Sequence, residues 1–233
     1  EALLGTNVVE VTTRDELRDV VGRARDAGVA VMAQEKVPVA AGEDRSVVSY
    51  VPPSGTDDAL AVVGNTRQRH PAGYGTGCLV RTTSDPTLVD RALSLLSAAG
   101  YYGISEAEFV YDDHREEYVL LDVNTRPWKW IGLPVAAGAN LPMAAYTDAV
   151  GIDRPAADPG DAVWVSILDY VQACVADPTA FDLLVADQRR ALLAGTFEDR
   201  ADLTTAVFAP NDPDPTQQLL STFFGTTTYY CAC

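Results

Sequence analysis

Two short apolar runs around a polar turn, in residues 106–128, constrain the fold of this chain more than any other stretch. The segment reads EAEFVYDDHREEYVLLDVNTRPW. Its apolar runs, 107–111 and 118–123, flank the polar turn 112–117, which is the pattern of a β-hairpin. The sequence therefore predicts two antiparallel strands in this region.

Carboxylate and amide side chains occur at fixed places in both arms of this hairpin. Alternate side chains of a strand share a face, so Glu106 and Glu108 project together. On the second arm, Asp122, Asn124 and Arg126 project together where the strand stays extended. If the arms pair around the turn, Glu108 faces Asp122 and Asn124.

Such an all-oxygen set suits a hard cation. Mg²⁺ prefers carboxylate and amide oxygens, keeps several waters and shares ligands with phosphates. The alternative interpretation is an edge hairpin whose solvated face carries acids, and the composition favours it, because acids are frequent throughout the chain. The formal net charge is −16, with 33 acidic and 17 basic residues.

This charge also limits the class of partner. A strongly acidic surface repels phosphodiester backbones, which argues against nucleic acid. No apolar run approaches the roughly 20 residues of a membrane span, and no signal-peptide pattern occurs. We therefore expect a cytoplasmic protein without a membrane partner. The acid-rich, lysine-poor composition is halophile-like, although genomic base composition can also replace lysine by arginine.

The cysteines and histidines offer little chemistry. Cys78 and Cys174 lie in apolar stretches and are predicted to be buried small hydrophobes. The terminal pair, Cys231 and Cys233, can bind metal or cycle redox, but a frayed terminus is the simpler interpretation. Only two histidines occur in the chain, which disfavours a histidine-based metal site or general base.

The N-terminal part predicts a strand–helix–strand unit. Residues 8–12 alternate as a short strand, and Thr13 and Glu16 have the spacing of a helix capping box. Gly28 is a natural stop for the helix, and residues 29–33 read as a buried strand. The segment 34–38, QEKVP, then reads as an extended linker.

The next region predicts a hairpin and a glycine-rich loop. Strands are expected at 46–51 and 59–64, after a charged turn at 42–45. Residues 66–77 then combine Arg67 and Arg69 with the run PAGYGTG. A dinucleotide-binding fingerprint should open a helix, whereas a strand follows here, which excludes a Rossmann interpretation. The two arginines can clamp phosphate oxygens, or they can be solvated residues of a flexible hairpin.

The remaining elements are read from caps and periodicity. Ser84 is expected to cap a helix with Pro86 in its first turn, ending at Gly100. A loop is expected at 131–140, followed by a helix over 141–150. The C-terminal part is predicted to contain a linker at 151–161, a strand at 163–171, a helix at 181–193, a turn at 211–215 and a short apolar stretch at 219–224.

Five motifs together resemble one family of enzymes. Their order along the chain is that of ATP-grasp enzymes, and they are most similar to the carboxylate–amine ligase branch. The similarity covers most of residues 8–150 and extends faintly to about residue 215. The motifs are QEKVP at 34–38, PAGYG at 71–75, AEF at 107–109, LDVNTRPW at 121–128 and GANLP at 138–142.

The resemblance implies an α+β fold with a mainly antiparallel sheet, flanking helices and a partial lid subdomain at the N-terminus. It implies three parts: a remnant of the lid at 1–35, a catalytic subdomain at 36–150 and a C-terminal extension at 151–233. The phosphate-binding lysines of the family come from strands upstream of residue 8, and Lys36 and Lys129 do not match them. We therefore expect an N-terminally truncated chain.

The resemblance also implies a role for each site residue. Glu108, Asp122 and Asn124 would hold two Mg²⁺ (or Mn²⁺) ions against the ATP phosphates, and Arg126 would steady an acyl phosphate. Asp122 stands where the family usually has glutamate, and Thr125 where it usually has proline. The implied nucleotide contacts are Gln34, Glu35 and Val37 for adenine, Glu43 or Asp44 for ribose, and Arg67 and Arg69 for the phosphates.

The implied function is an ATP-dependent ligase that joins a small-molecule carboxylate to an amine through an acyl phosphate. One alternative is a non-catalytic module, derived from an ATP-grasp enzyme, that binds a nucleotide or a partner without turnover. A third interpretation is a plain α+β interaction domain with an acidic face, in which Glu108 and Asp122 do not converge.

Overall fold

The computed structural model describes residues 8–73, 75–198, 200 and 202–225. Its residues fall into two compact units that meet in sequence between Pro38 and Val39. The terminal cysteines, Cys231 and Cys233, lie outside the described residues. Within the described residues, none of the helices has both the length and the apolar composition that crossing a bilayer requires.

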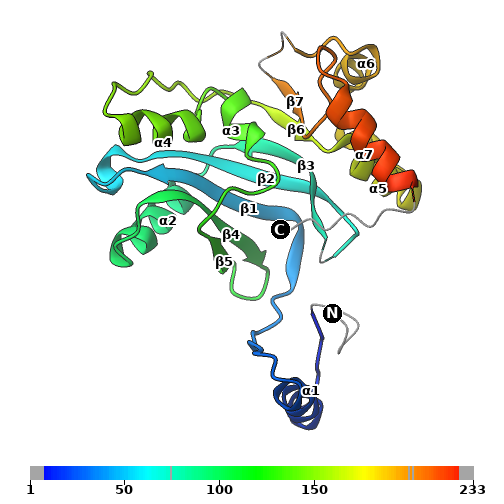
Figure 1. Cartoon of the computed structure of the whole chain (residues 1–233). Coiled ribbons are helices and arrows are strands. Elements are labelled where there is room, and N and C mark those ends of the chain that lie inside the picture. Colours follow the sequence, from blue (N-terminus) through cyan, green and yellow to red (C-terminus); the bar gives the residue numbers. More distant parts are fainter. Residues whose placement is uncertain (1–7, 74, 199, 201, 226–233) are drawn as a thin grey trace. The chain divides into compact units, whose positions relative to one another are not determined.

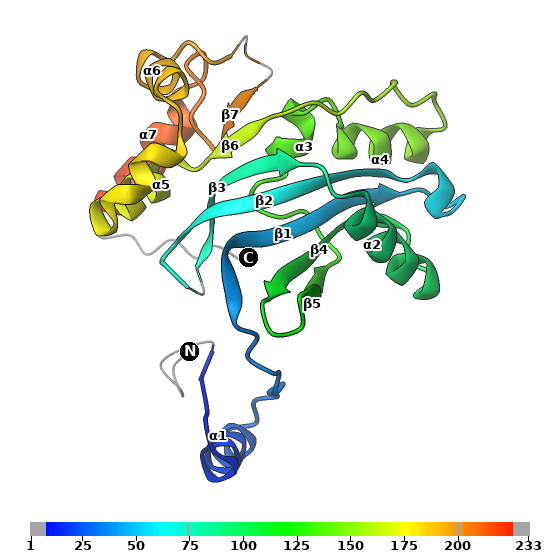
Figure 2. The same ribbon diagram turned by 180° about the vertical axis from the view of Figure 1, so that it is seen from behind.

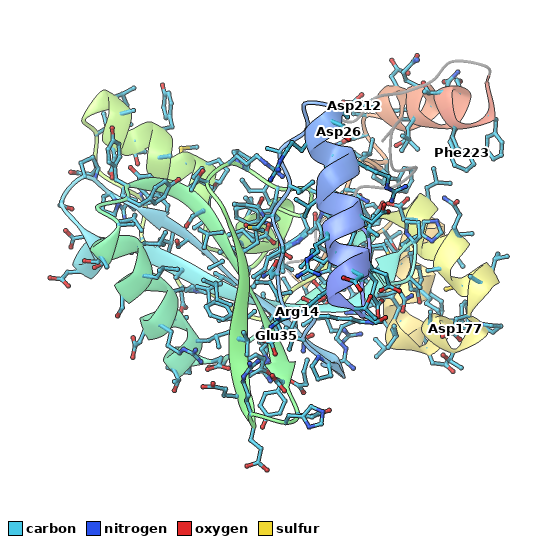
Figure 3. The ribbon with its side chains drawn as sticks, turned by 90° about the horizontal axis from the view of Figure 1, so that it is seen from below. Arg14, Asp26, Glu35, Asp177, Asp212 and Phe223 are labelled. Atoms are coloured by element: carbon cyan, nitrogen blue, oxygen red, sulfur yellow. The ribbon has the colours of Figure 1, made fainter. Side chains whose placement is uncertain are left out.

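The first unit contains helix α1 (Arg14–Asp26), whose two ends are labelled in Figure 3. The predicted capping box is confirmed. Thr13 Oγ1 accepts a hydrogen bond of 3.2 Å from the Glu16 amide, and the Glu16 carboxylate accepts one of 3.1 Å from the Thr13 amide. The helix ends before Gly28, whose φ of 71° is left-handed.

The two strands predicted beside α1 are wrong. Residues 8–12 and 29–33 form no ladder in the described part of the chain, although the Lys36 ammonium and the Glu10 carboxylate lie 2.7 Å apart. Val29, Val31 and Met32 are exposed rather than buried. Strand propensity is expressed only where a neighbouring strand and a covering layer accept the side chains, and the described residues of this unit supply neither.

The second unit is built on a sheet of seven described strands in the order β5-β4-β1-β2-β3-β6-β7. All neighbouring strands in it are antiparallel except β6 and β7. The strands are β1 (Val39–Val51), β2 (Leu60–His70), β3 (Thr76–Thr83), β4 (Gly103–Asp112), β5 (Glu117–Asn124), β6 (Val163–Val165) and β7 (Leu203–Thr205). The expected α+β class with a mainly antiparallel sheet is confirmed.

Helices cover both faces of this sheet. Helix α2 (Pro86–Ala98) lies on one face, and α3 (Gly132–Ala136) and α4 (Leu141–Val150) lie on the other (Figures 1 and 2). A short turn of helix, η1 (Thr56–Asp58), precedes β2. The C-terminal part adds further helices around β6 and β7, which are α5 (Ile167–Ala176), η2 (Pro178–Leu183), α6 (Ala186–Ala194) and α7 (Asp214–Phe224).

Side-chain caps determine where the covering helices begin. Asn140 accepts a 2.9 Å hydrogen bond from the Met143 amide and starts α4, as predicted. For α2 the expected cap, Ser84, is wrong by one residue. The Asp85 carboxylate accepts a 3.0 Å hydrogen bond from the Leu88 amide, and it therefore satisfies the first turn.

Three apolar clusters hold the layers together. One lies between α2 and the sheet and includes Val47, Leu88 and Phe109. A second packs Trp130 and Trp164 with α3 and α4 against the opposite face. The third joins the C-terminal helices to β3 and β6. Cys78 is fully buried and Cys174 is partly buried against this third cluster, and both are free thiols.

Other sequence predictions need correction. Residues 42–45 continue β1 rather than turning, with a register shift between Val39 and Asp44. The loop expected at 131–140 contains α3. The strand expected at 163–171 stops at Val165, and α5 then buries Tyr170 and Ala173 at helical spacing. The helix expected at 181–193 is interrupted by extended backbone at 184–185. Helix α7 begins within the turn predicted at 211–215 and includes the apolar stretch at 219–224.

Gly64 gives a direct test of this packing. A Cβ at Gly64 would lie 2.7 Å from Cη2 of the buried Trp130 ring and 3.2 Å from Val80 Cγ1. Overpacking of this kind costs about 1–3 kcal/mol. We therefore expect Gly64→Ala to lower the free energy of unfolding by that amount in urea titrations. Gly160→Ala is the control, because no atom lies within 4 Å of a Cβ placed at Gly160; equal stability of the two variants would contradict the packing.

Candidate functional site

The β4–β5 hairpin brings its polar side chains together as the sequence predicts. Glu108 pairs with Asp122 and Glu106 pairs with Asn124 in the ladder. Directly opposed residues of an antiparallel pair have Cβ atoms about 4.5–5.5 Å apart. The ladder register shifts between Glu108 and Phe109, so a bulge lies beside this group of side chains.

Asn124 is the centre of the group. Its Nδ2 donates hydrogen bonds of 2.9 Å to Glu108 Oε1 and 3.2 Å to Glu106 Oε2. Asp122 is exposed, and its carboxylate accepts a 2.8 Å hydrogen bond from the Val123 amide. The structure therefore joins Asn124 to both glutamates of β4 and places Asp122 opposite Glu108.

Arg69 approaches the same carboxylates from β2. Its Nε donates a 2.6 Å hydrogen bond to Asp44 Oδ2 on β1, and its Nη1 donates a 2.9 Å hydrogen bond to the Gly75 carbonyl. Its Nη2 lies 3.5 Å from Glu108 Oε2. All three guanidinium nitrogens thus face an acceptor, and each acceptor belongs to a different segment of the chain.

The environment disfavours negative charge on both glutamates. Burial and the neighbouring Glu108 raise the pKa of Glu106 to about 8, although the Ser46 hydroxyl, Asn124 and Arg69 act in the opposite direction. Burial, Asp44 and Asp122 raise the pKa of Glu108, against the opposing effect of Arg69. Added positive charge at this point would therefore stabilise the ionised carboxylates.

The donor set fits a hard divalent cation. Glu108 and Asp122 supply carboxylate oxygens, and rotation of the Asn124 amide would present its oxygen in place of Nδ2. No group of three or more histidines, cysteines, aspartates and glutamates in the described residues could hold a metal ion by itself. A cation here would therefore depend on the Asn124 amide, water and phosphate oxygens for its remaining ligands.

The contacts described for three other predicted residues lie outside this group. Glu43 accepts hydrogen bonds from Arg45 Nη2, at 2.9 Å, and from the Tyr118 hydroxyl, whereas its neighbour Asp44 contacts Arg69. Arg67 is exposed, and its guanidinium lies beside Gly42, where a Cβ would approach Nη1 to 3.4 Å. Arg126 is exposed and donates a 3.2 Å hydrogen bond to the Pro127 carbonyl.

The predicted adenine contacts belong to the first unit. Gln34, Glu35 and Val37 all precede its boundary at Pro38. They therefore belong to a different unit from the group on β4 and β5, and their contacts to a nucleotide stay predictions.

Two features of the structure were not predicted. Glu106 is only 4% exposed, and its shared face with Glu108 was the one sequence signal that could have identified it. Lys129, just after the hairpin, donates to Thr76 Oγ1 at 3.1 Å and to Asp169 Oδ2 at 2.5 Å. Asp169 lies in α5, within a part of the chain that showed no clustered chemistry in sequence, and no local pattern indicated this contact.

Comparison with known proteins supports the fold. No protein-family model matches the chain, and no curated protein matches it in sequence. Among solved structures, N5-carboxyaminoimidazole ribonucleotide synthetase from Thermus thermophilus is similar with a TM-score of 0.51 and 16% identity. The similarity covers 66% of this chain and 42% of that one.

Two further solved structures give lower TM-scores. The biotin carboxylase complex from Campylobacter jejuni has a TM-score of 0.49 and 17% identity, over 62% of this chain and 34% of that one. The biotin carboxylase domain of 2-oxoglutarate carboxylase from Hydrogenobacter thermophilus has a TM-score of 0.46 and 14% identity, over 64% and 35%.

The architecture and the similarity to the ribonucleotide synthetase together support the expected ATP-grasp-like α+β fold. The chain spans less than half the length of each of these three solved structures.

Proposed function

We propose that this chain carries the metal and phosphate side of an ATP-dependent ligase that joins a carboxylate to an amine. One observation carries the proposal: Asn124 bridges Glu108 and Glu106 across the β4–β5 ladder, with Asp122 opposite Glu108. Glu106 is buried and Glu108 is partly buried. Two carboxylates in such surroundings around one amide are costly for stability, and binding of a cation offsets that cost.

Each residue has a defined task in this proposal. Glu108, Asp122 and Asn124 would hold Mg²⁺ or Mn²⁺, which neutralises the charge on the ATP phosphates when bound. Arg69 lies beside Glu108 and would contact a phosphate oxygen, as would Arg67. Arg126 is exposed two residues after the end of β5, and it would contact an acyl phosphate. Glu43 would contact the ribose, because Asp44 already accepts a hydrogen bond from Arg69. Gln34, Glu35 and Val37 stay the predicted adenine contacts.

The proposed reaction needs no protein nucleophile. A carboxylate oxygen of the substrate attacks the γ-phosphorus of ATP, the bond to the β,γ-bridging oxygen breaks, and ADP leaves. The amine nitrogen then attacks the acyl carbon, the bond to the phosphate oxygen breaks, and the amine proton passes to solvent. The protein contributes positioning and charge stabilisation, as in other phosphoryl transfers.

The proposed organisation assigns residues 1–35 to a lid remnant, 36–150 to the catalytic subdomain and 151–233 to an extension. The pairing of β6 with β3 joins the extension to the sheet of the catalytic part. The Lys129–Asp169 ion pair also ties the extension to the segment that follows Arg126.

The test is MgATP binding by calorimetry, followed by ADP release with a panel of small carboxylates and amines. We expect MgATP binding and ADP release that requires both substrates. Binding without ADP release for any pair would instead favour the second candidate, a non-catalytic nucleotide-binding module. Asp122 and Thr125, which differ from the residues usual in the family at these places, support that candidate. No binding of Mg²⁺ or MgATP would leave an interaction domain with an acidic face.

A further inference from the structure

Arg69 is held more firmly than a phosphate contact requires. Its three nitrogens face Asp44, Gly75 and Glu108, at 2.6, 2.9 and 3.5 Å. The Arg69 and Asp44 side chains are 27% and 15% exposed, so solvent screens their attraction only in part. The longest of the three contacts is the one to Glu108.

A cation bound at the proposed metal site would affect these three contacts of Arg69 differently. Asp44 and the Gly75 carbonyl do not belong to the proposed metal ligands, so a bound cation leaves their contacts to Arg69 in place. The contact to Glu108 uses an oxygen that a divalent cation would also use. The other Glu108 oxygen already accepts a hydrogen bond from Asn124. Arg69 and a cation therefore compete for Glu108.

We propose that Arg69 is a resident counter-cation for Glu108 and that Asp44 is the positioning residue that holds it there. Without a metal ion, Arg69 neutralises Glu108. With a metal ion bound, Nη2 is released from Glu108 and is available to a nucleotide phosphate, while Asp44 and Gly75 keep the guanidinium in place. This inference rests on the proposed function, because it uses the same metal site.

The bonding of Asp44 supports a positioning role. Its Oδ2 accepts from Arg69, and its Oδ1 is buried without a hydrogen-bond partner among the described residues. A buried carboxylate oxygen without a partner lowers the stability of the fold. Stability alone therefore does not explain an aspartate at position 44. The Arg69 guanidinium also fixes the Gly75 carbonyl, so the glycine-rich loop is tied to the same ion pair.

The counter-cation role predicts effects of opposite sign. Arg69→Gln removes the competing charge, so Mn²⁺ alone should bind about threefold to tenfold more tightly. The same variant should bind ATP at saturating Mg²⁺ at least about tenfold more weakly, because a phosphate contact is lost. Arg69→Lys keeps the charge but cannot span three acceptors. It should retain near wild-type Mn²⁺ affinity and lose part of the ATP affinity.

Asp44→Asn tests the positioning role. It leaves Arg69 present but removes its shortest ion pair, so ATP affinity should fall about threefold to tenfold. The measurements are Mn²⁺ titration by electron paramagnetic resonance and ATP titration by calorimetry, on the whole chain. Asp57→Asn and Arg190→Gln, both at exposed positions, are the matched controls. Thermal unfolding checks that each variant is folded. If Arg69→Gln does not fold, the proposal is tested with Asp44→Asn and Arg69→Lys.

The possible failures are distinguishable. If the wild-type chain binds Mn²⁺ but Arg69→Gln or Arg69→Lys weakens Mn²⁺ and ATP in parallel, the counter-cation inference is overturned and the proposed function stands. Unchanged ATP affinity in Asp44→Asn overturns the positioning role. If the wild-type chain binds neither Mn²⁺ nor MgATP, the proposed metal site and the inference are overturned together.

Discussion

Replacing Asn124 with alanine is expected to reduce ADP release by at least about 100-fold and to weaken Mn²⁺ binding by at least about tenfold. The Asn124 amide is the only side chain shown to donate to both Glu106 and Glu108 among the described residues. Its loss removes a proposed metal ligand and the hydrogen bonds that orient the two carboxylates. The measurements are coupled-enzyme detection of ADP and a Mn²⁺ titration.

The stability of this variant separates a functional loss from unfolding. Two hydrogen bonds to Asn124 are removed, which should cost about 1–3 kcal/mol in the free energy of unfolding. Thr125→Ala, at an exposed neighbouring position, is the matched control and should retain activity and metal affinity. Arg126→Ala should also abolish ADP release but leave Mn²⁺ affinity and stability unchanged, because Arg126 is exposed. Normal turnover in Asn124→Ala or Arg126→Ala would refute the assigned roles.

The stability of the metal-free protein should fall as the pH rises from about 4.5 to about 8. The pKa of Glu106 is about 8 in the fold, against an ordinary value of 4.5. Below the ordinary value the carboxyl is protonated in both states and contributes no pH dependence. Between the two values the unfolded state loses its proton while the folded state keeps it, so unfolding becomes easier. Above the folded-state value the full cost is present.

Glu106→Gln isolates this contribution. The amide resembles the protonated carboxyl and cannot ionise, so the variant should match the wild type near pH 4 and exceed its stability near pH 9. The expected difference is on the order of a few kcal/mol. Urea unfolding in EDTA-containing buffers across this range measures it. Glu117→Gln, at an exposed position in the same hairpin, is the control, and parallel stability curves for Glu106→Gln and the wild type would contradict the assignment.

Local patterns were sufficient to predict the hairpin and its polar face. Alternation placed Glu108 opposite Asp122, and the ladder confirms that pairing. The capping box at Thr13 and the start of a helix after Asn140 were also readable, because each depends on a side chain and an amide only three residues apart. Fold class followed from the same short-range signals together with motif order.

The rest depended on contacts between residues distant in sequence. The strands expected at 8–12 and 29–33 are wrong because strand formation requires a partner that the described residues of the first unit do not supply. The burial of Glu106 follows from the layers packed around its strand. The approach of Arg69 to Asp44 and of Asp169 to Lys129 spans 25 and 40 residues of sequence, and neither pair leaves a local signal.

The position of β5 has a consequence for solubility. Among the described strands it is the outermost on its side of the sheet, so one row of its backbone amides and carbonyls has no neighbouring strand there. Such a row can recruit a strand from another molecule, and charged side chains hinder that association. Asp122, which is exposed on β5, lies at this border. The acid expected to hold a cation therefore also protects the sheet from aggregation, and neutralising it by substitution would expose the protein to that hazard.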